Sequence, residues 1–143
     1  GMINTLIKQM IEIVKRSGEE YFTFSSIRAE IDSPILELGM EDLFFEELIR
    51  TQKRVGSIRT ARGDIFYIGR DKRTIGRFLV DLLPESGGVD IDAMRDKIME
   101  SLLLDFERSF LVMNVRGKGG YFSLETEMLY RDKDVFLDSI FES

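Results

Sequence analysis

The chain of 143 residues contains no cysteine, no histidine and no tryptophan, and it has only two prolines. Without cysteine there are no disulfides, no thiolate nucleophiles and no cysteine-based zinc sites. Without histidine the chain also lacks the commonest general base and the commonest metal ligand. Catalysis would have to depend on carboxylates, lysines or hydroxyls, and the sequence offers no constellation of these. We therefore expect a protein that is not an enzyme, with no catalytic residues, no metal and no cofactor.

Long apolar runs are missing as well. The chain contains no stretch of about 18 apolar residues, so we predict no membrane span. The apolar residues between Ile3 and Val14 are interrupted by polar ones, so we predict no secretory signal. A hydrophobic content of 43% and a charged content of 32% are typical of a globular protein. The absence of cysteine fits a reducing compartment, and we expect a cytoplasmic protein without a membrane partner.

The first third of the chain predicts two helices. Residues 7–14 place apolar side chains at positions i, i+3, i+4 and i+7, which is one face of a helix that ends near Gly18. A short second helix is predicted after Thr23 and Ser25, since both are good N-cap residues. This helix is expected to end before Pro34, because proline disfavours helix in the residue that precedes it.

A third helix and a β-hairpin are predicted next. The helix runs from about Met40 to Arg54, and Phe45 is expected to face outward from it. Residues 55–68 are rich in β-forming residues, and Gly63 lies near their middle, which predicts a hairpin. Tyr67 is also expected to face outward, and exposed aromatic side chains would favour a protein partner.

The second half of the chain repeats this order. Four pairs of segments match in sequence: 7–14 with 75–82, Phe22–Ile31 with Val89–Ile98, Glu41–Glu46 with Glu100–Asp105, and Arg62-Gly63 with Arg116-Gly117. A duplicated supersecondary unit explains four matches in the same order. The offset between the copies falls from 68 positions to 59, which predicts that the second copy has lost residues between its second and third helices.

Helix, short capped helix, helix and β-hairpin is the order of the winged-helix (winged helix-turn-helix) fold, and both halves resemble it. The resemblance covers about residues 3–69 and 74–125. It implies an α+β fold of two winged-helix-like units in tandem, each with three helices and a β-hairpin. We predict a first unit over residues 2–72 and a shorter second unit over residues 73–125. A C-terminal amphipathic tail over residues 126–143 is expected to form one more helix.

Positive charge is concentrated in the middle of the chain. The net charge is −6, yet residues 50–77 hold nine basic residues and only two acidic ones. The winged-helix resemblance implies a nucleic-acid site, with the third helix in the major groove and the hairpin on the backbone. In the second copy, a glycine-rich hairpin tip is expected to carry further basic residues. The candidate nucleic-acid-binding residues are Lys53, Arg54, Arg59, Arg62, Lys72, Arg73, Arg116 and Lys118.

The predicted third helices depart from this pattern because they are acidic. Phosphates would be repelled by Glu41, Asp42, Glu46 and Glu47 in the first copy, and by Glu100, Asp105 and Glu107 in the second. We therefore expect contact with DNA or RNA phosphates to be led by the hairpins, in a nucleic-acid-binding or transcription-related module. The alternative is a protein-interaction or architectural module of a larger assembly, in which the basic stretch merely balances acidic neighbours. The sequence does not predict the oligomeric state.

Two further patterns have ordinary structural explanations. Asp90, Asp92 and Asp96 superficially resemble a calcium loop, but the required glycine and distant glutamate are not in place. Capping of a helix N-terminus explains these aspartates better. Residues 117–120 lack the spacing of a phosphate-binding P-loop, and a hairpin turn is the better prediction.

Overall fold

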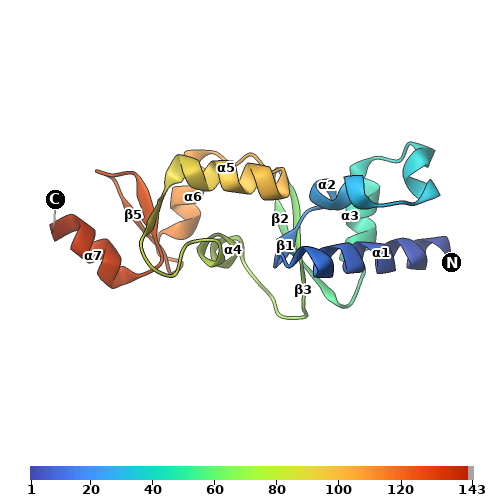
Figure 1. Ribbon diagram of the computed structural model, residues 1–143, viewed down its shortest axis with the longest axis horizontal. Helices are drawn as coiled ribbons and strands as arrows, with labels where there is room; N and C mark the ends of the chain where they lie inside the picture. The colour runs from blue at the N-terminus through green and yellow to red at the C-terminus, as the bar shows by residue number, and fades with distance from the viewer. Residues whose placement is uncertain (142–143) are drawn as a thin grey trace. The chain divides into compact units, whose positions relative to one another are not determined.

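The computed structural model describes residues 1–141, and its chain divides into two units (Figure 1). The first unit is Gly1–Lys72 together with Ser101–Leu103, and the second is Arg73–Glu100 together with the chain from Leu104 onward. Each unit combines helices with a three-stranded antiparallel sheet, so the predicted α+β class is confirmed. Within residues 1–141, no helix is both long enough and apolar enough to span a membrane.

The first unit follows the predicted order of elements. These are α1 (Met2–Ser17), β1 (Tyr21–Phe22), α2 (Phe24–Ile27), the 3₁₀ turns η1 (Arg28–Glu30) and η2 (Pro34–Leu38), α3 (Asp42–Arg50), β2 (Val55–Thr60) and β3 (Gly63–Ile68). Thr23 caps α2 as expected, since its hydroxyl accepts a hydrogen bond from the Ser26 amide at 3.0 Å. The Ser33-Pro34 pair begins η2, and α3 is shorter than the predicted helix.

The helices of the first unit share an apolar core, and they lie to one side of the sheet in Figure 1. Phe45 is at the centre of this core, where its ring stacks on Phe24 with centroids 4.7 Å apart. The expectation that Phe45 and Tyr67 face outward is wrong, because they are only 0% and 2% exposed. The rotation of α3 that buries Phe45 exposes Leu43 and Phe44 instead.

The first sheet has the strand order β1-β3-β2. The predicted hairpin over residues 55–68 is confirmed: β2 and β3 pair from Val55 with Ile68 to Thr60 with Gly63. The turn is therefore Ala61-Arg62, and Gly63 is the first residue of β3 rather than the tip. The short strand β1 was not predicted, and it pairs with β3 through Tyr21 and Phe22.

The second unit repeats the order of the first. Its elements are α4 (Ile75–Asp81), β4 (Gly88–Asp90), α5 (Ile91–Leu102), α6 (Arg108–Val115), β5 (Tyr121–Ser123), β6 (Met128–Tyr130) and α7 (Lys133–Phe141). The strand order β4-β6-β5 corresponds to β1-β3-β2, so the central strand is the last strand of each unit. The two units thus share element order and sheet topology, as the duplication in the sequence predicts.

The predicted position of the third helix in the second copy is wrong. Residues 100–105 are the end of α5 and the chain that follows it, and the third helix is α6, which begins only at Arg108. Glu41 and Glu107 are the true counterparts, because each is an N-cap residue with φ −73° and ψ 154°. They lie 66 positions apart, close to the 67 positions between Thr23 and Asp90. The second copy has therefore lost no stretch of residues between its second and third helices.

The predicted second hairpin is also misplaced. The glycine-rich loop, which we define as residues 116–120, connects α6 to β5 and is not a hairpin tip. The hairpin of the second unit pairs β5 with β6 around a turn at residues 124–127. The predicted unit boundary after residue 125 falls inside that turn, and β6 is the central strand of the sheet. The predicted C-terminal helix is present as α7, and residues 142–143 of the predicted tail lie outside the described residues.

Candidate nucleic-acid interface

Four exposed cations gather at the base of the first hairpin. Lys53 and Arg54 lie in the turn between α3 and β2, and Arg70 and Lys72 follow β3. The Gly69 amide donates a hydrogen bond to the Arg54 carbonyl at 2.9 Å, which places the two chain segments side by side. We call Lys53, Arg54, Arg70 and Lys72 the base cluster. Arg70 was not among the predicted site residues, although it lies within the basic stretch.

Tyr67 holds the second half of the base cluster in place. Its hydroxyl donates a hydrogen bond to the Asp71 carbonyl at 2.7 Å, between Arg70 and Lys72 in the chain. The Tyr67 ring is itself fixed, because Tyr21 packs edge-on against it with centroids 6.0 Å apart. The base cluster therefore extends from an ordered backbone, although the side chains themselves reach into solvent.

No carboxylate within residues 1–141 forms an ion pair with a member of the base cluster. Arg50 behaves differently, because its Nε donates to Asp64 Oδ2 at 3.0 Å and its Nη1 lies 3.2 Å from Glu47 Oε1. The view that the basic stretch balances its acidic neighbours thus describes Arg50 well. It does not describe Lys53, Arg54, Arg70 or Lys72, whose charges stay available to an external anion.

Arg59 and Arg62 lie at the other end of the hairpin. Arg59 is exposed near the end of β2, and no carboxylate in residues 1–141 pairs with it. Arg62 is exposed in the turn, where the Thr60 hydroxyl accepts a hydrogen bond from its amide at 3.1 Å. Arg59 lies five positions after Arg54 along an extended strand, which corresponds to about 17 Å. The predicted set of cations on the first hairpin is therefore split between its base and its tip.

Near the tip of the hairpin, an ionic network joins β3 to α3 at Asp64, which is opposite Arg59 in the β2–β3 register. Asp64 is 7% exposed and receives its hydrogen bonds from Arg50. Hydrogen bonding to Asp64 raises the pKa of Arg50. Glu46 accepts a hydrogen bond from the Asp64 amide at 3.3 Å. Burial raises the pKa of Glu46, and the nearby Asp64 carboxylate raises it further.

The start of α3 presents acidic and apolar side chains to solvent. Asp42 pairs with Arg28 and Glu47 pairs with Arg50, while Glu41 has no ion-pair partner in residues 1–141. Leu43 is 59% exposed beside them. A surface of carboxylates and apolar groups repels phosphates and offers no donor to base edges.

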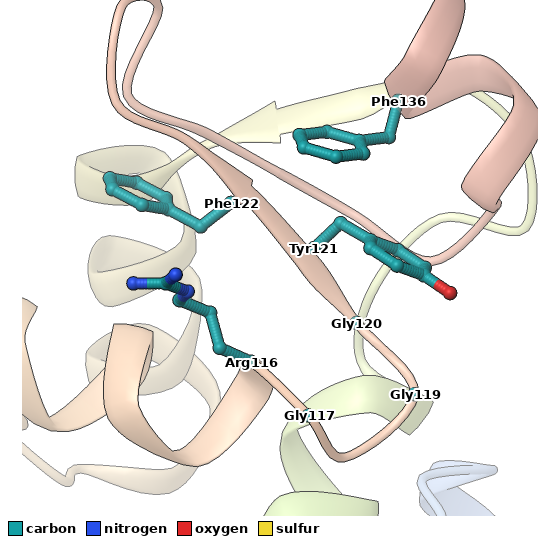
Figure 2. Close-up of a pocket in the computed structure, with 7 residues that line it drawn as sticks. All are labelled: Arg116, Gly117, Gly119, Gly120, Tyr121, Phe122 and Phe136. Atoms are coloured by element: carbon teal, nitrogen blue, oxygen red, sulfur yellow. The ribbon is translucent and has the colours of Figure 1, made fainter.

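In the second unit, Arg116 and Lys118 lie in the glycine-rich loop. This loop borders a hollow of about 350 Å³, whose lining is Arg116, Gly117, Gly119, Gly120, Tyr121, Phe122 and Phe136. Figure 2 shows Arg116 and Phe122 on one side of β5, with Tyr121 and Phe136 on the other. Phe136 stacks on Tyr121 with centroids 5.3 Å apart, which docks α7 on the second sheet.

The second hairpin offers no basic tip. Its turn carries Glu125 and Glu127, and the Glu127 carboxylate binds Arg108 Nη2 at 2.7 Å. Arg73 is half-buried at the start of the second unit. Of the eight predicted residues, three are thus brought together at the base of the first hairpin: Lys53, Arg54 and Lys72. Arg59 and Arg62 lie apart from them, at the tip of the same hairpin.

The aspartates near residue 90 cap a helix. Asp90 Oδ2 accepts hydrogen bonds from the amides of Asp92 and Ala93 at 2.9 and 3.2 Å, as the capping interpretation predicts. Across residues 1–141, no group of three or more acidic side chains is arranged to hold a metal ion.

No family model matches the chain, and no match was found among characterised proteins or solved structures. The winged-helix resemblance stays a prediction from the order of elements.

Proposed function

We propose that this protein is a non-enzymatic module that binds the phosphate backbone of DNA or RNA through its first hairpin. The observation that carries the proposal is the base cluster of four exposed cations without ion-pair partners. An acidic protein that leaves Lys53, Arg54, Arg70 and Lys72 unpaired on one ordered surface is suited to an external polyanion. The winged-helix resemblance favours the same reading.

The proposed contact is with the backbone and not with base edges. Phosphate contacts from lysine and arginine give affinity and position without sequence information. The acidic start of α3 opposes entry of that helix into a groove. We therefore infer that binding is similar for every nucleic-acid sequence, and that it weakens steeply with salt as counterions are displaced.

A titration of labelled duplex DNA and single-stranded RNA, at low and at physiological salt, tests the proposal. Sequence-independent binding is expected with a dissociation constant of roughly 1–100 μM, weakening steeply with salt. Two double variants distinguish the contributions of the hairpin base and the hairpin tip to binding: Lys53→Ala/Arg54→Ala and Arg59→Ala/Arg62→Ala. Each phosphate contact removed should lower the salt slope by about one.

The matched control is Arg131→Ala/Lys133→Ala, which makes the same change in net charge at exposed residues of the second unit. It should leave affinity and salt slope close to those of the unmodified protein. The proposal is wrong if no binding occurs at low salt, or if the control variant loses as much affinity as the hairpin variants.

A further inference from the structure

The junction of η2 and α3 presents a group of apolar side chains to solvent. Four large apolar side chains are exposed there: Leu38 (70%), Met40 (40%), Leu43 (59%) and Phe44 (37%). Met40, Leu43 and Phe44 border a shallow hollow of about 520 Å³, which we call the α3 hollow. Its lining is Gly39, Met40, Glu41, Leu43, Phe44 and Glu47. Contiguous apolar surface of this kind marks an interaction site more often than scattered single residues do.

The floor of the α3 hollow is ordered before anything binds. Phe44 packs edge-on against Phe45, with ring centroids 5.2 Å apart and planes at 82°. Phe45 is buried and stacks on Phe24, so Phe44 rests on the core of the unit. The Arg28–Asp42 ion pair ties the first turn of α3 to the chain that follows α2. A partner would not have to order these side chains, which lowers the entropic cost of binding.

The unpaired charge around the α3 hollow is acidic, because Arg28 and Arg50 at its edge already form ion pairs with Asp42 and Glu47. Residues 29–49 contain seven acidic residues and no lysine or arginine. Glu37 and Glu41 are exposed, and within residues 1–141 neither has an ion-pair partner. Apolar floor and acidic rim together exclude nucleic acids and acidic peptides as occupants. They are complementary to an apolar segment that carries its own basic residues.

We propose that the α3 hollow is a docking site for a basic amphipathic segment of another protein. Apolar side chains of that segment fill the hollow over Leu43 and Phe44, and its lysines or arginines meet Glu37 and Glu41. An amphipathic helix in a groove is a common form of such recognition. Figure 1 shows the η2–α3 junction, in cyan, at the end of the first unit opposite its sheet. The hollow is therefore distinct from the hairpin to which we assign phosphate binding.

The test uses the full chain and a labelled helical peptide of leucine and lysine, in which the leucines are spaced i, i+3, i+4 and i+7. Two further peptides serve as controls: one has glutamate in place of lysine, and one has the same composition in scrambled order. Fluorescence anisotropy is expected to detect saturable binding of the leucine–lysine peptide alone. Amide shifts in the NMR spectrum should map to residues 38–47.

Protein variants show whether the hollow is the site. Leu43→Ser should weaken binding about tenfold or more, because it removes an apolar contact from the centre of the interface. Leu124→Ser is the matched control, since Leu124 is 80% exposed in the second unit. Glu37→Gln/Glu41→Gln should weaken binding and reduce its salt dependence. Circular dichroism of each variant serves as the control for folding.

Three results overturn the proposal. The first is that the leucine–lysine peptide does not bind, or binds no better than its scrambled form. The second is that Leu43→Ser and Leu124→Ser change its affinity equally. The third is a concentration-dependent dimer in sedimentation velocity that Leu43→Ser dissolves, which would assign the hollow to a second copy of this chain.

Discussion

Tyr67 lies across the first sheet from Gly56, and its ring fills the space that a side chain at residue 56 would need. A β-carbon on Gly56 would come within 2.1 Å of Cε2 and Cζ of the ring. The two residues are partners in the β2–β3 register. On the other flank, Tyr21 on β1 is paired with Tyr67 and packs edge-on against it. The central tyrosine thus connects all three strands.

The second sheet uses the same arrangement with its flanks exchanged. Tyr130 on the central strand β6 lies over Gly88, where a β-carbon would come within 2.5 Å of Cε1. Gly88 is on β4, which corresponds to β1, the strand that carries Tyr21. On the other flank, Tyr121 on β5 is paired with Tyr130. Each unit therefore accommodates one large central ring by placing a glycine on one neighbouring strand and a tyrosine on the other.

Gly56→Ala should displace the Tyr67 ring and lower the free energy of unfolding. Overpacking a site that cannot relax costs about 1–3 kcal/mol. Urea denaturation measures the loss. Tyr67→Phe is the companion variant: it keeps the ring and removes the hydroxyl that donates to the Asp71 carbonyl, which should cost about 1 kcal/mol. An alanine variant as stable as the unmodified protein would show that the ring moves aside freely.

Arg50 is expected to stabilise the first hairpin more than any other cation of the basic stretch. Arg50→Met leaves the buried Asp64 carboxylate without its donor, and a buried polar group that loses its partner costs roughly 1–3 kcal/mol. Arg59→Met is the control on the same hairpin, and a change at an exposed residue should stay within about 0.5 kcal/mol. Equal losses in the two variants would argue against the ionic network.

The double variant Arg50→Met/Asp64→Asn tests whether the loss of stability in Arg50→Met comes from the Asp64 carboxylate that it leaves without a partner. If the cost of Arg50→Met comes from a stranded carboxylate, removing the charge of Asp64 should recover part of the lost stability. No recovery would mean that Arg50 acts through packing or through Glu46 and Glu47 instead.

Features with a strong local signature were predictable from the sequence. The caps at Thr23 and Asp90 and the first hairpin all depend on residues close together in the chain. The glycines at 117 and 119 were recognised as turn residues, and both have positive φ, but they connect α6 to β5. A glycine signal reports a local conformation and does not say which two elements the loop joins.

Features that depend on distant contacts were not predictable. Five apolar residues between 43 and 49 are more than one helical face can bury, so periodicity could not choose between Phe45 and Leu43. Phe45 is the buried residue because its ring stacks on Phe24. The same orientation of α3 leaves Leu43 and Phe44 exposed at the α3 hollow. The second copy has no counterpart of Pro34, so α5 extends to Leu102, into the block 100–105 in which a new helix was expected. The strands β1 and β4 are too short for a period to show.

Asp90 should contribute to stability through its cap of α5. Asp90→Ala removes the side-chain acceptor of two amides, and loss of an N-cap costs about 1 kcal/mol. Asp96→Ala is the matched control, because it makes the same charge change at an exposed position of the same helix. Urea denaturation should show a clear loss for the first variant and a change within about 0.5 kcal/mol for the second.

Glu46 should make the stability of the first unit depend on pH. Its raised pKa means that the folded protein holds the Glu46 proton more tightly than the unfolded chain does. As pH rises above the ordinary glutamate value of about 4.3, the unfolded chain loses this proton first. The Glu46 contribution to the free energy of unfolding therefore falls with rising pH until the pH passes the raised pKa.

Glu46→Gln removes this loss of stability while its amide oxygen can still accept from the Asp64 amide. We expect the variant to be more stable than the unmodified protein at neutral pH, with an advantage that shrinks as pH falls below about 4.3. Urea denaturation across this pH range measures the difference. The same change at the exposed Glu41 should have an effect within about 0.5 kcal/mol. A Glu46→Gln advantage that is absent at neutral pH, or constant with pH, would mean that burial beside Asp64 imposes no cost on the carboxylate.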